Sequence, residues 1–195
     1  MKQPSFLAAA TFAAALLLAA SASAGDAAAG KAKAEPCAAC HGETGNSKLE
    51  NIPSLAGQPP YYLLVQLVLF REKQRINEPM LPLVEKLSDG DLDDLAAYFA
   101  AQQLEPGPTP TDAALAARGK EVADGAHCGQ CHLPTFAGRE QMARLAGQRE
   151  DYLLKALTEF KRGDRPGLDG TMSEAIYNVS EADLPALAHY LSHLR

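Results

Sequence analysis

The sequence predicts an all-α protein built from two tandem copies of one small domain. A set of motifs in the first half of the 195-residue chain returns about 90 positions later, which indicates an internal duplication. Apolar residues recur at helical spacing in both halves, and no alternating β-branched run competes with them. A proline-rich segment separates the halves, so each domain has about 80 to 90 residues.

The duplication is clearest around the motif Leu-Ala-Gly-Gln. This motif ends at Gln58 and again at Gln148, and Tyr-Leu-Leu follows it in both copies. Upstream, a Cys-x-x-Cys-His frame recurs at an offset of 91, and downstream a Ser-x-x-Asp pair recurs at 92. These small changes of offset place short insertions in the loops.

The first 24 residues have the composition of a secretory signal peptide. Lys2 is followed by an apolar run from Phe6 to Ala20, and small residues at Ala22 and Ala24 predict cleavage before Gly25. The alternative is a retained membrane anchor, because the apolar segment approaches bilayer-spanning length. Removal of residues 1–24 leaves a formal charge of -7. We therefore expect an exported, acidic protein.

Composition divides the exported part of the chain into two domains. Three prolines alternate with Gly and Thr in residues 103–111, a pattern that resists helix formation and favours an extended connector. We predict domain 1 over residues 25–102, a linker over 103–111 and domain 2 over 112–195. Domains this small form only a marginal protein core, so a further stabiliser is expected.

Each domain is expected to contain three helical regions. An early helix runs into the cysteine pair, and Asp112 or Thr111 can cap the second of these. A middle helix over residues 61–75 carries an apolar stripe that the second copy repeats. Ser88 and Ser180 each precede an aspartate three residues later, which predicts a capped closing helix in each domain.

All four cysteines lie in two matching frames, Cys37-Ala-Ala-Cys40-His41 and Cys128-Gly-Gln-Cys131-His132. This frame is the attachment motif of haem c. Its two thiols add to the vinyl groups of one haem, and the histidine that follows binds the iron. A thioredoxin-like redox pair would need a βαβ context, and a zinc site would need the two frames to meet across domains. We therefore expect two covalently bound haems.

Met80 and Met172 are the candidates for the other axial position of each iron. After residue 24, Met80 is the only methionine of the first domain, which has no second histidine. The methionines lie 39 residues after His41 and 40 residues after His132, and each precedes a capping serine by eight residues. The alternative role is that of a core gap-filler.

Four other side chains of the second domain compete less well for this position: Met142, His127, His189 and His193. The methionine is close in sequence to the proximal histidine and aligns with Ile52, which favours core packing. The first histidine adjoins the attachment frame and cannot easily reach the opposite haem face. The other two lie on the closing helix, where the first domain has alanines, so packed or solvated positions are expected.

Together these motifs resemble the cytochrome c4 family, the dihaem class I cytochromes c, over essentially all of residues 25–195. The resemblance implies a cytochrome c fold in each domain and two haems close together across a pseudo-twofold axis. It also implies histidine and methionine ligation of both irons and electron transport in the periplasm. The implied residues are Cys37, Cys40, His41 and Met80 for one haem, and Cys128, Cys131, His132 and Met172 for the other.

The resemblance further implies that Pro53 accepts a hydrogen bond from the proximal histidine through its carbonyl, which orients the imidazole. The second repeat departs from the family pattern because Ala143 aligns with Pro53. A carbonyl is retained there, but the stiff ring is lost. Tyr98 and Tyr190 are expected to pack near Gly30 and Gly119 of the opening helices.

The predicted function is that of a periplasmic one-electron carrier between a quinol-oxidising complex and a terminal oxidase or reductase. An iron with both axial positions filled by protein offers no place for a substrate. Alternatives are a haem enzyme with one iron that opens, such as a peroxidase or a sulfur-compound oxidase, and a cytochrome subunit of a membrane oxidase. A pI near 5.4 without a basic run argues against nucleic acid as a partner. Membrane contact is expected to be peripheral or absent.

Overall fold

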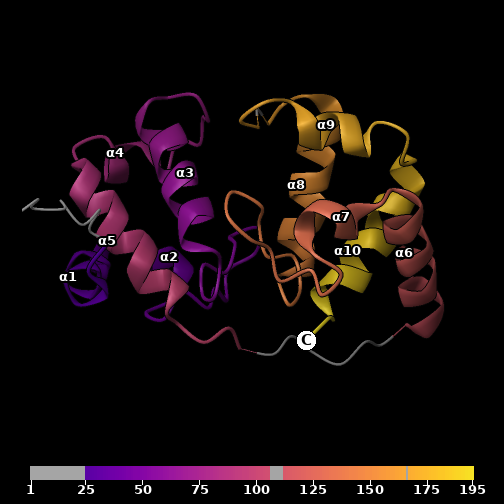
Figure 1. The fold of residues 1–195 in the computed structure, drawn as a ribbon, viewed down its shortest axis with the longest axis horizontal. Coiled ribbons are helices and arrows are strands. Elements are labelled where there is room, and N and C mark those ends of the chain that lie inside the picture. The colour runs from indigo at the N-terminus through magenta and orange to yellow at the C-terminus, as the bar shows by residue number, and fades with distance from the viewer. Residues whose placement is uncertain (1–24, 106–111, 166) are drawn as a thin grey trace, which may run out of the picture.

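A computed structural model describes residues 25–105, 112–165 and 167–195. These residues form helices and loops, and their only β-type pairing is an isolated bridge between Arg139 and Met142. Two helical domains lie side by side (Figure 1). None of the helices in these ranges combines the length and the apolar composition needed to cross a bilayer. The predicted signal peptide and most of the predicted linker lie outside the described residues.

The first domain contains five helices: α1 (Ala27–Lys33), α2 (Glu35–His41), α3 (Pro60–Arg71), α4 (Leu81–Val84) and α5 (Asp89–Ala100). The predicted closing helix begins at the expected cap. Ser88 Oγ accepts a hydrogen bond from the Asp91 backbone N–H at 3.2 Å, and the Asp91 carboxylate accepts one from the Ser88 backbone N–H at 2.9 Å. This reciprocal pair is a complete capping box.

The second domain repeats this order with α6 (Ala113–Gly125), α7 (Cys128–His132), α8 (Glu150–Arg162), α9 (Thr171–Ile176) and α10 (Leu184–Ser192). Asp112 caps α6 by accepting from the Leu115 backbone N–H at 2.9 Å. Ser180 caps a short 3-10 turn, Glu181–Asp183, that leads into α10. The expected caps of both closing helices are therefore present.

Two expectations about helix bounds need revision. The early helix of each domain is interrupted before the cysteine frame, at Ala34 in the first domain and at Ala126 and His127 in the second. Pro36 lies at the start of α2, where a missing N–H is tolerated, and His127 has a left-handed φ of 55°. The middle helix of the first domain ends at Arg71, because the backbone N–H groups of residues 74 and 75 both turn back to the Leu69 carbonyl.

Each domain is held together by the crossing of its opening and closing helices, α1 with α5 and α6 with α10. A glycine lies at each crossing. A Cβ added at Gly30 would lie 2.0 Å from the Asp94 carbonyl oxygen, and one added at Gly119 would lie 2.0 Å from that of Ala186. The nearby tyrosines, Tyr98 and Tyr190, also contact these glycines, as expected. Only glycine allows the helix backbones to approach this closely.

The two domains meet through α3, α8 and the loops that precede them. In each repeat, the glutamine of the Leu-Ala-Gly-Gln motif makes the same pair of hydrogen bonds to the backbone of the opposite domain. Gln58 donates to the Arg144 carbonyl and accepts from the Arg144 N–H, both at 2.9 Å. Gln148 does the same with the backbone of Ser54, both at 2.8 Å. Both glutamines are buried, so the interface has a local twofold arrangement of satisfied amides.

Candidate haem-binding site

A cavity in the first domain brings together the residues that the sequence singles out. Cys37, Cys40 and His41 reach it from α2, and Met80 reaches it from the residue before α4. The remaining walls are largely apolar and come from α3, α5 and the loop after α2, including Leu55, Leu63, Leu67, Phe70, Leu95 and Phe99. The four residues proposed for one haem therefore line one apolar cavity.

The imidazole of His41 is oriented by the backbone. Its Nδ1 lies 2.9 Å from the Pro53 carbonyl oxygen, which can only accept, so Nδ1 carries the proton and Nε2 is left with a lone pair. Burial lowers the pKa of His41, and the bond to Pro53 opposes that change only in part. The ring is therefore neutral near pH 7, as an iron ligand must be.

The second domain has an equivalent cavity, which Cys131, His132 and Met172 line. His132 Nδ1 lies 2.7 Å from the Ala143 carbonyl oxygen, so the bond survives the loss of the proline ring. Burial also lowers the pKa of His132, against a smaller opposing effect of this bond. The substitution of alanine for proline leaves the orientation of the histidine intact.

The two methionines of this second cavity differ in their attachment to the fold. Met172 lies within α9, a short helix that follows Gly170 and that the sequence did not predict. Met142 also lines the cavity, but it directly precedes Ala143, which holds the proximal imidazole. Met172 therefore comes from a separate element, as Met80 does in the first domain.

The state of the thiols distinguishes this site from a redox-active cysteine pair. None of the four cysteines is paired in a disulfide. Burial raises the pKa of the Cys37 and Cys128 thiols, whereas thioredoxin-like pairs depend on a lowered pKa. The cysteines that line the cavities are Cys37 and Cys40 in the first domain and Cys131 in the second, each beside a neutral imidazole, which fits covalent attachment of haem.

A buried cluster that the sequence analysis did not single out separates the two cavities. Arg165 donates to the Tyr152 hydroxyl at 3.1 Å and to the Tyr62 hydroxyl at 3.4 Å. Arg75, at the equivalent position, donates to Tyr152 at 3.4 Å and to Gln66 at 2.7 Å. Both tyrosines line both cavities. Tyr62 and Arg75 both recur at an offset of 90, so the sequence could have singled out these positions. The sequence does not show that the repeated residues meet across the domain interface.

The electrostatics of this cluster are unusual. Arg165 is only 6% exposed, and in the described residues no carboxylate lies within ion-pair distance of Arg165 or Arg75. Burial raises the pKa of Tyr152, but the two arginines outweigh it and lower the pKa to about 8. Burial and the neighbouring Tyr152 raise the pKa of Tyr62. Two cations that have no carboxylate partner among the described residues thus lie between the cavities.

Comparison with known proteins matches this arrangement. The family model described as cytochrome c matches residues 27–103 and again residues 116–195. The chain is 38% identical over 174 residues to cytochrome c4 of Pseudomonas aeruginosa, covering 85% of this chain and 87% of that protein. The chain belongs to the cytochrome c4 family.

A solved structure and a second relative extend the comparison. Reduced recombinant cytochrome c4 from Pseudomonas stutzeri superimposes with a TM-score of 0.82 at 36% identity, covering 88% of this chain and 100% of that one. A protein of Thiomonas intermedia named thiosulfate dehydrogenase electron acceptor is 34% identical over 171 residues, covering 82% of this chain and 79% of that protein. This cytochrome therefore carries two covalently bound haem c groups in two cytochrome c domains, and it transfers electrons.

Proposed function

We propose that this dihaem cytochrome is a periplasmic one-electron carrier in which a histidine and a methionine bind each iron. The assignment is Cys37, Cys40, His41 and Met80 for the first haem, and Cys128, Cys131, His132 and Met172 for the second. The observation that carries it is the presence, in each domain, of a neutral proximal imidazole and a methionine from a separate element in one apolar cavity.

When bound, each haem iron supplies one-electron redox chemistry, and a thioether ligand favours its reduced state. The protein contributes a fixed imidazole, an apolar enclosure and a thioether. If His41 and Met80 hold one iron and His132 and Met172 hold the other, neither iron would have a position left for substrate, which supports a carrier over a haem enzyme.

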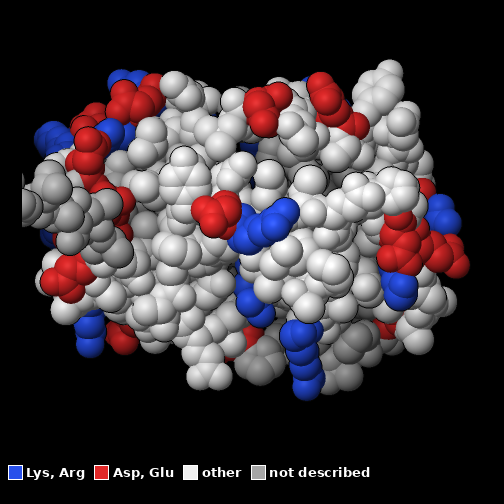
Figure 2. Space-filling view, viewed as in Figure 1, with Lys and Arg blue, Asp and Glu red and all other residues white. Residues whose placement is uncertain are grey.

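The surface supports docking of redox partners at the cavity edges. Leu83 and Leu168 line the first and the second cavity and are 41% and 57% exposed. On the face drawn in Figure 2, broad uncharged areas cover both domains, and acidic and basic side chains lie mainly around them. This pattern fits brief apolar contacts near the haems, with charge serving mainly solubility.

For the partners, we propose a quinol-oxidising complex as donor and a terminal oxidase or reductase as acceptor. The Thiomonas intermedia relative supports a second kind of donor, an enzyme that oxidises sulfur compounds. Reduction of the purified cytochrome by each donor class, followed by stopped-flow absorbance, distinguishes the two. Export with cleavage before Gly25 is part of the proposal, and N-terminal sequencing of the mature protein tests it.

The ligand assignment is tested by carbon monoxide. The pyridine assay should count two haem c groups per chain, and the native reduced protein should have a low-spin absorption spectrum and should not bind carbon monoxide promptly. Met80→Ala and Met172→Ala should each open one iron to carbon monoxide and lower its potential, whereas Met142→Ala, in the same cavity as Met172, should not. Prompt binding by the unmodified protein would support the haem-enzyme alternative, and opening by Met142→Ala would transfer the ligand role to Met142.

A further inference from the structure

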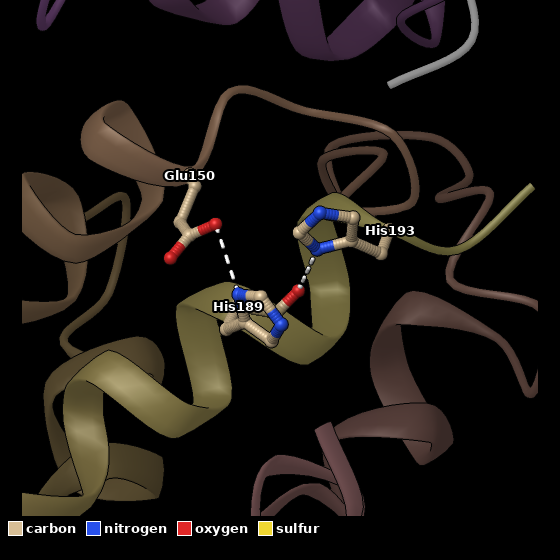
Figure 3. Close-up of side chains that lie close together, drawn as sticks. All are labelled: Glu150, His189 and His193. Carbon is tan, nitrogen blue, oxygen red and sulfur yellow. Dashed lines mark hydrogen bonds and ion pairs between the residues drawn. The ribbon is translucent and has the colours of Figure 1, made fainter. Parts of the chain in front are cut away.

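Two histidines and a glutamate form a cluster outside both haem cavities. His189 lies in the last turn of α10, His193 directly follows that helix, and Glu150 begins α8 (Figure 3). His189 Nδ1 lies 3.1 Å from Glu150 Oε2, and the two imidazole ring centres are 4.3 Å apart. One donor atom from each of the three residues lies within 4.8 Å of the other two. We propose that this cluster binds a divalent transition-metal ion of the zinc and copper class.

The donor set selects this class of ion. Two imidazoles and one carboxylate suit Zn²⁺, Cu²⁺ or Ni²⁺, whereas Ca²⁺ and Mg²⁺ require mainly oxygen ligands. Ligands at about 2.0 to 2.1 Å from a tetrahedral ion are about 3.3 Å from one another, close to the present separation of His189 and Glu150. Rotation of the half-buried His193 and the exposed Glu150 side chain supplies the remaining movement.

Hydrogen bonding accounts for only one nitrogen of His189, because Nδ1 pairs with Glu150. This residue is 4% exposed, and its Nε2 is buried without a hydrogen-bond partner in the part of the chain that the structure describes. An unsatisfied buried polar atom costs about 1–3 kcal/mol. The first domain has Ala97 at the equivalent position, and its counterparts of His193 and Glu150 are Ala101 and Pro60. All three potential ligands are therefore particular to the second repeat.

The surroundings leave the carboxylate accessible to a cation. Glu150 and Ser192 line a polar groove of about 610 Å³ between the domains. The neighbouring Arg149 does not neutralise Glu150, because its guanidinium binds Asp151 at 2.8 Å and the Ser47 carbonyl at 3.2 Å. In the described residues the only ion-pair partner of Glu150 is His189 itself. A metal ion would take the place of the hydrogen bond between these two groups, and the neutral imidazole would carry its proton on Nε2 instead of Nδ1.

The test uses the complete haem-loaded protein, from which EDTA has first removed loosely bound metal ions. This protein is titrated with Zn²⁺ in an isothermal calorimeter near neutral pH. We expect one zinc ion per chain. His189→Ala, His193→Ala and Glu150→Gln should each weaken binding by about tenfold or more, a scale that even supporting residues of metal sites reach. The alanines of the first domain show that alanine is compatible with the fold at both histidine positions.

The exposed His127 provides the matched control, since His127→Ala removes a histidine outside the cluster. Binding by this variant should equal that of the unmodified protein, and the haem absorption spectrum of every variant should be unchanged. Absence of zinc binding by the unmodified protein would overturn the proposal. Undiminished binding by the variant that lacks both His189 and His193 would overturn it as well, and so would loss of binding in His127→Ala.

Discussion

Gln58 and Gln148 occupy equivalent positions in the two repeats, and each amide binds the backbone of the opposite domain through both its oxygen and its nitrogen. The four bonds join the segments that precede α3 and α8. They form next to the loops that hold the proximal histidines, because Ser54 directly follows Pro53 and Arg144 directly follows Ala143. The domain interface and the histidine geometry are thus connected through adjacent residues.

Removal of one of these amides should loosen the interface. Gln148→Ala leaves the buried N–H and carbonyl of Ser54 without partners, at a cost of about 1–3 kcal/mol each. We expect a lower urea midpoint, measured by haem absorbance and by helical circular dichroism. Gln103→Ala, at an exposed side chain, is the control and should leave the midpoint unchanged. Equal midpoints for both variants would show that the amide pair adds nothing to stability.

The helix crossings should not tolerate a methyl group. Gly119→Ala places a Cβ 2.0 Å from the Ala186 carbonyl oxygen, so α6 and α10 must separate. Overpacking of this kind costs about 1–3 kcal/mol or more. Gly125→Ala, near the end of the same helix with nothing within 4 Å, should be neutral or slightly stabilising. Thermal unfolding of the two variants compares them directly, and similar losses would contradict the crossing argument.

The first domain should lose a specific contribution to stability in acid. Lys33 contacts Asp91 at 2.7 Å and Asp94 at 2.6 Å, and these bonds hold the pKa of both carboxyl groups below its usual range. Because the folded-state pKa values are depressed, the contribution is complete above about pH 4 and is lost as the pH falls through them. The pKa of Lys33 is raised by the same bonds, so the contribution also persists until alkaline pH.

Lys33→Met tests this contribution. Its urea midpoint should be lower than that of the unmodified protein near pH 7, and the difference should shrink as the pH falls below about 4. Lys120→Met, which removes an exposed pair with Asp124 within one helix, should show a much smaller difference at any pH. A difference for Lys33→Met that does not change between neutral and acid pH would rule out an electrostatic origin.

Tyr152 should make the potentials of both haems depend on pH. Its pKa is lowered to about 8, and its side chain lines both cavities. Ionisation places a negative charge between the haems, which favours the oxidised irons, so both potentials should fall as the pH rises through about 8. Spectroelectrochemical titration from pH 6 to pH 10 measures this effect.

In Tyr152→Phe the step near pH 8 should disappear, whereas Tyr177→Phe, at a side chain that is 76% exposed, should retain it. A step of the same size in Tyr152→Phe would assign it to another group. Potentials that do not change with pH in the unmodified protein would show that the tyrosine stays protonated.

Local features were predictable because they depend on short stretches of chain. The capping box at Ser88 and the cap at Asp112 each join residues three positions apart, and both are present as expected. The bond from His132 to the Ala143 carbonyl was expected from the family resemblance, which gives the bond at Pro53, together with the alignment of the two repeats. The α9 helix around Met172 was not predicted, since it spans only six residues and its sequence carries a weak helical signal.

The sequence by itself determined the duplication, the two cysteine frames and the family, because these depend on residue identity and on spacing along the chain. Only the tertiary structure decided which side chains meet across 39 to 103 positions of the chain. It made Gln58 and Gln148 a reciprocal pair and buried Arg165 between two tyrosines. It also brought Glu150 to His189. Such meetings depend on how helices pack and how the domains dock, and no local pattern of residues records that geometry.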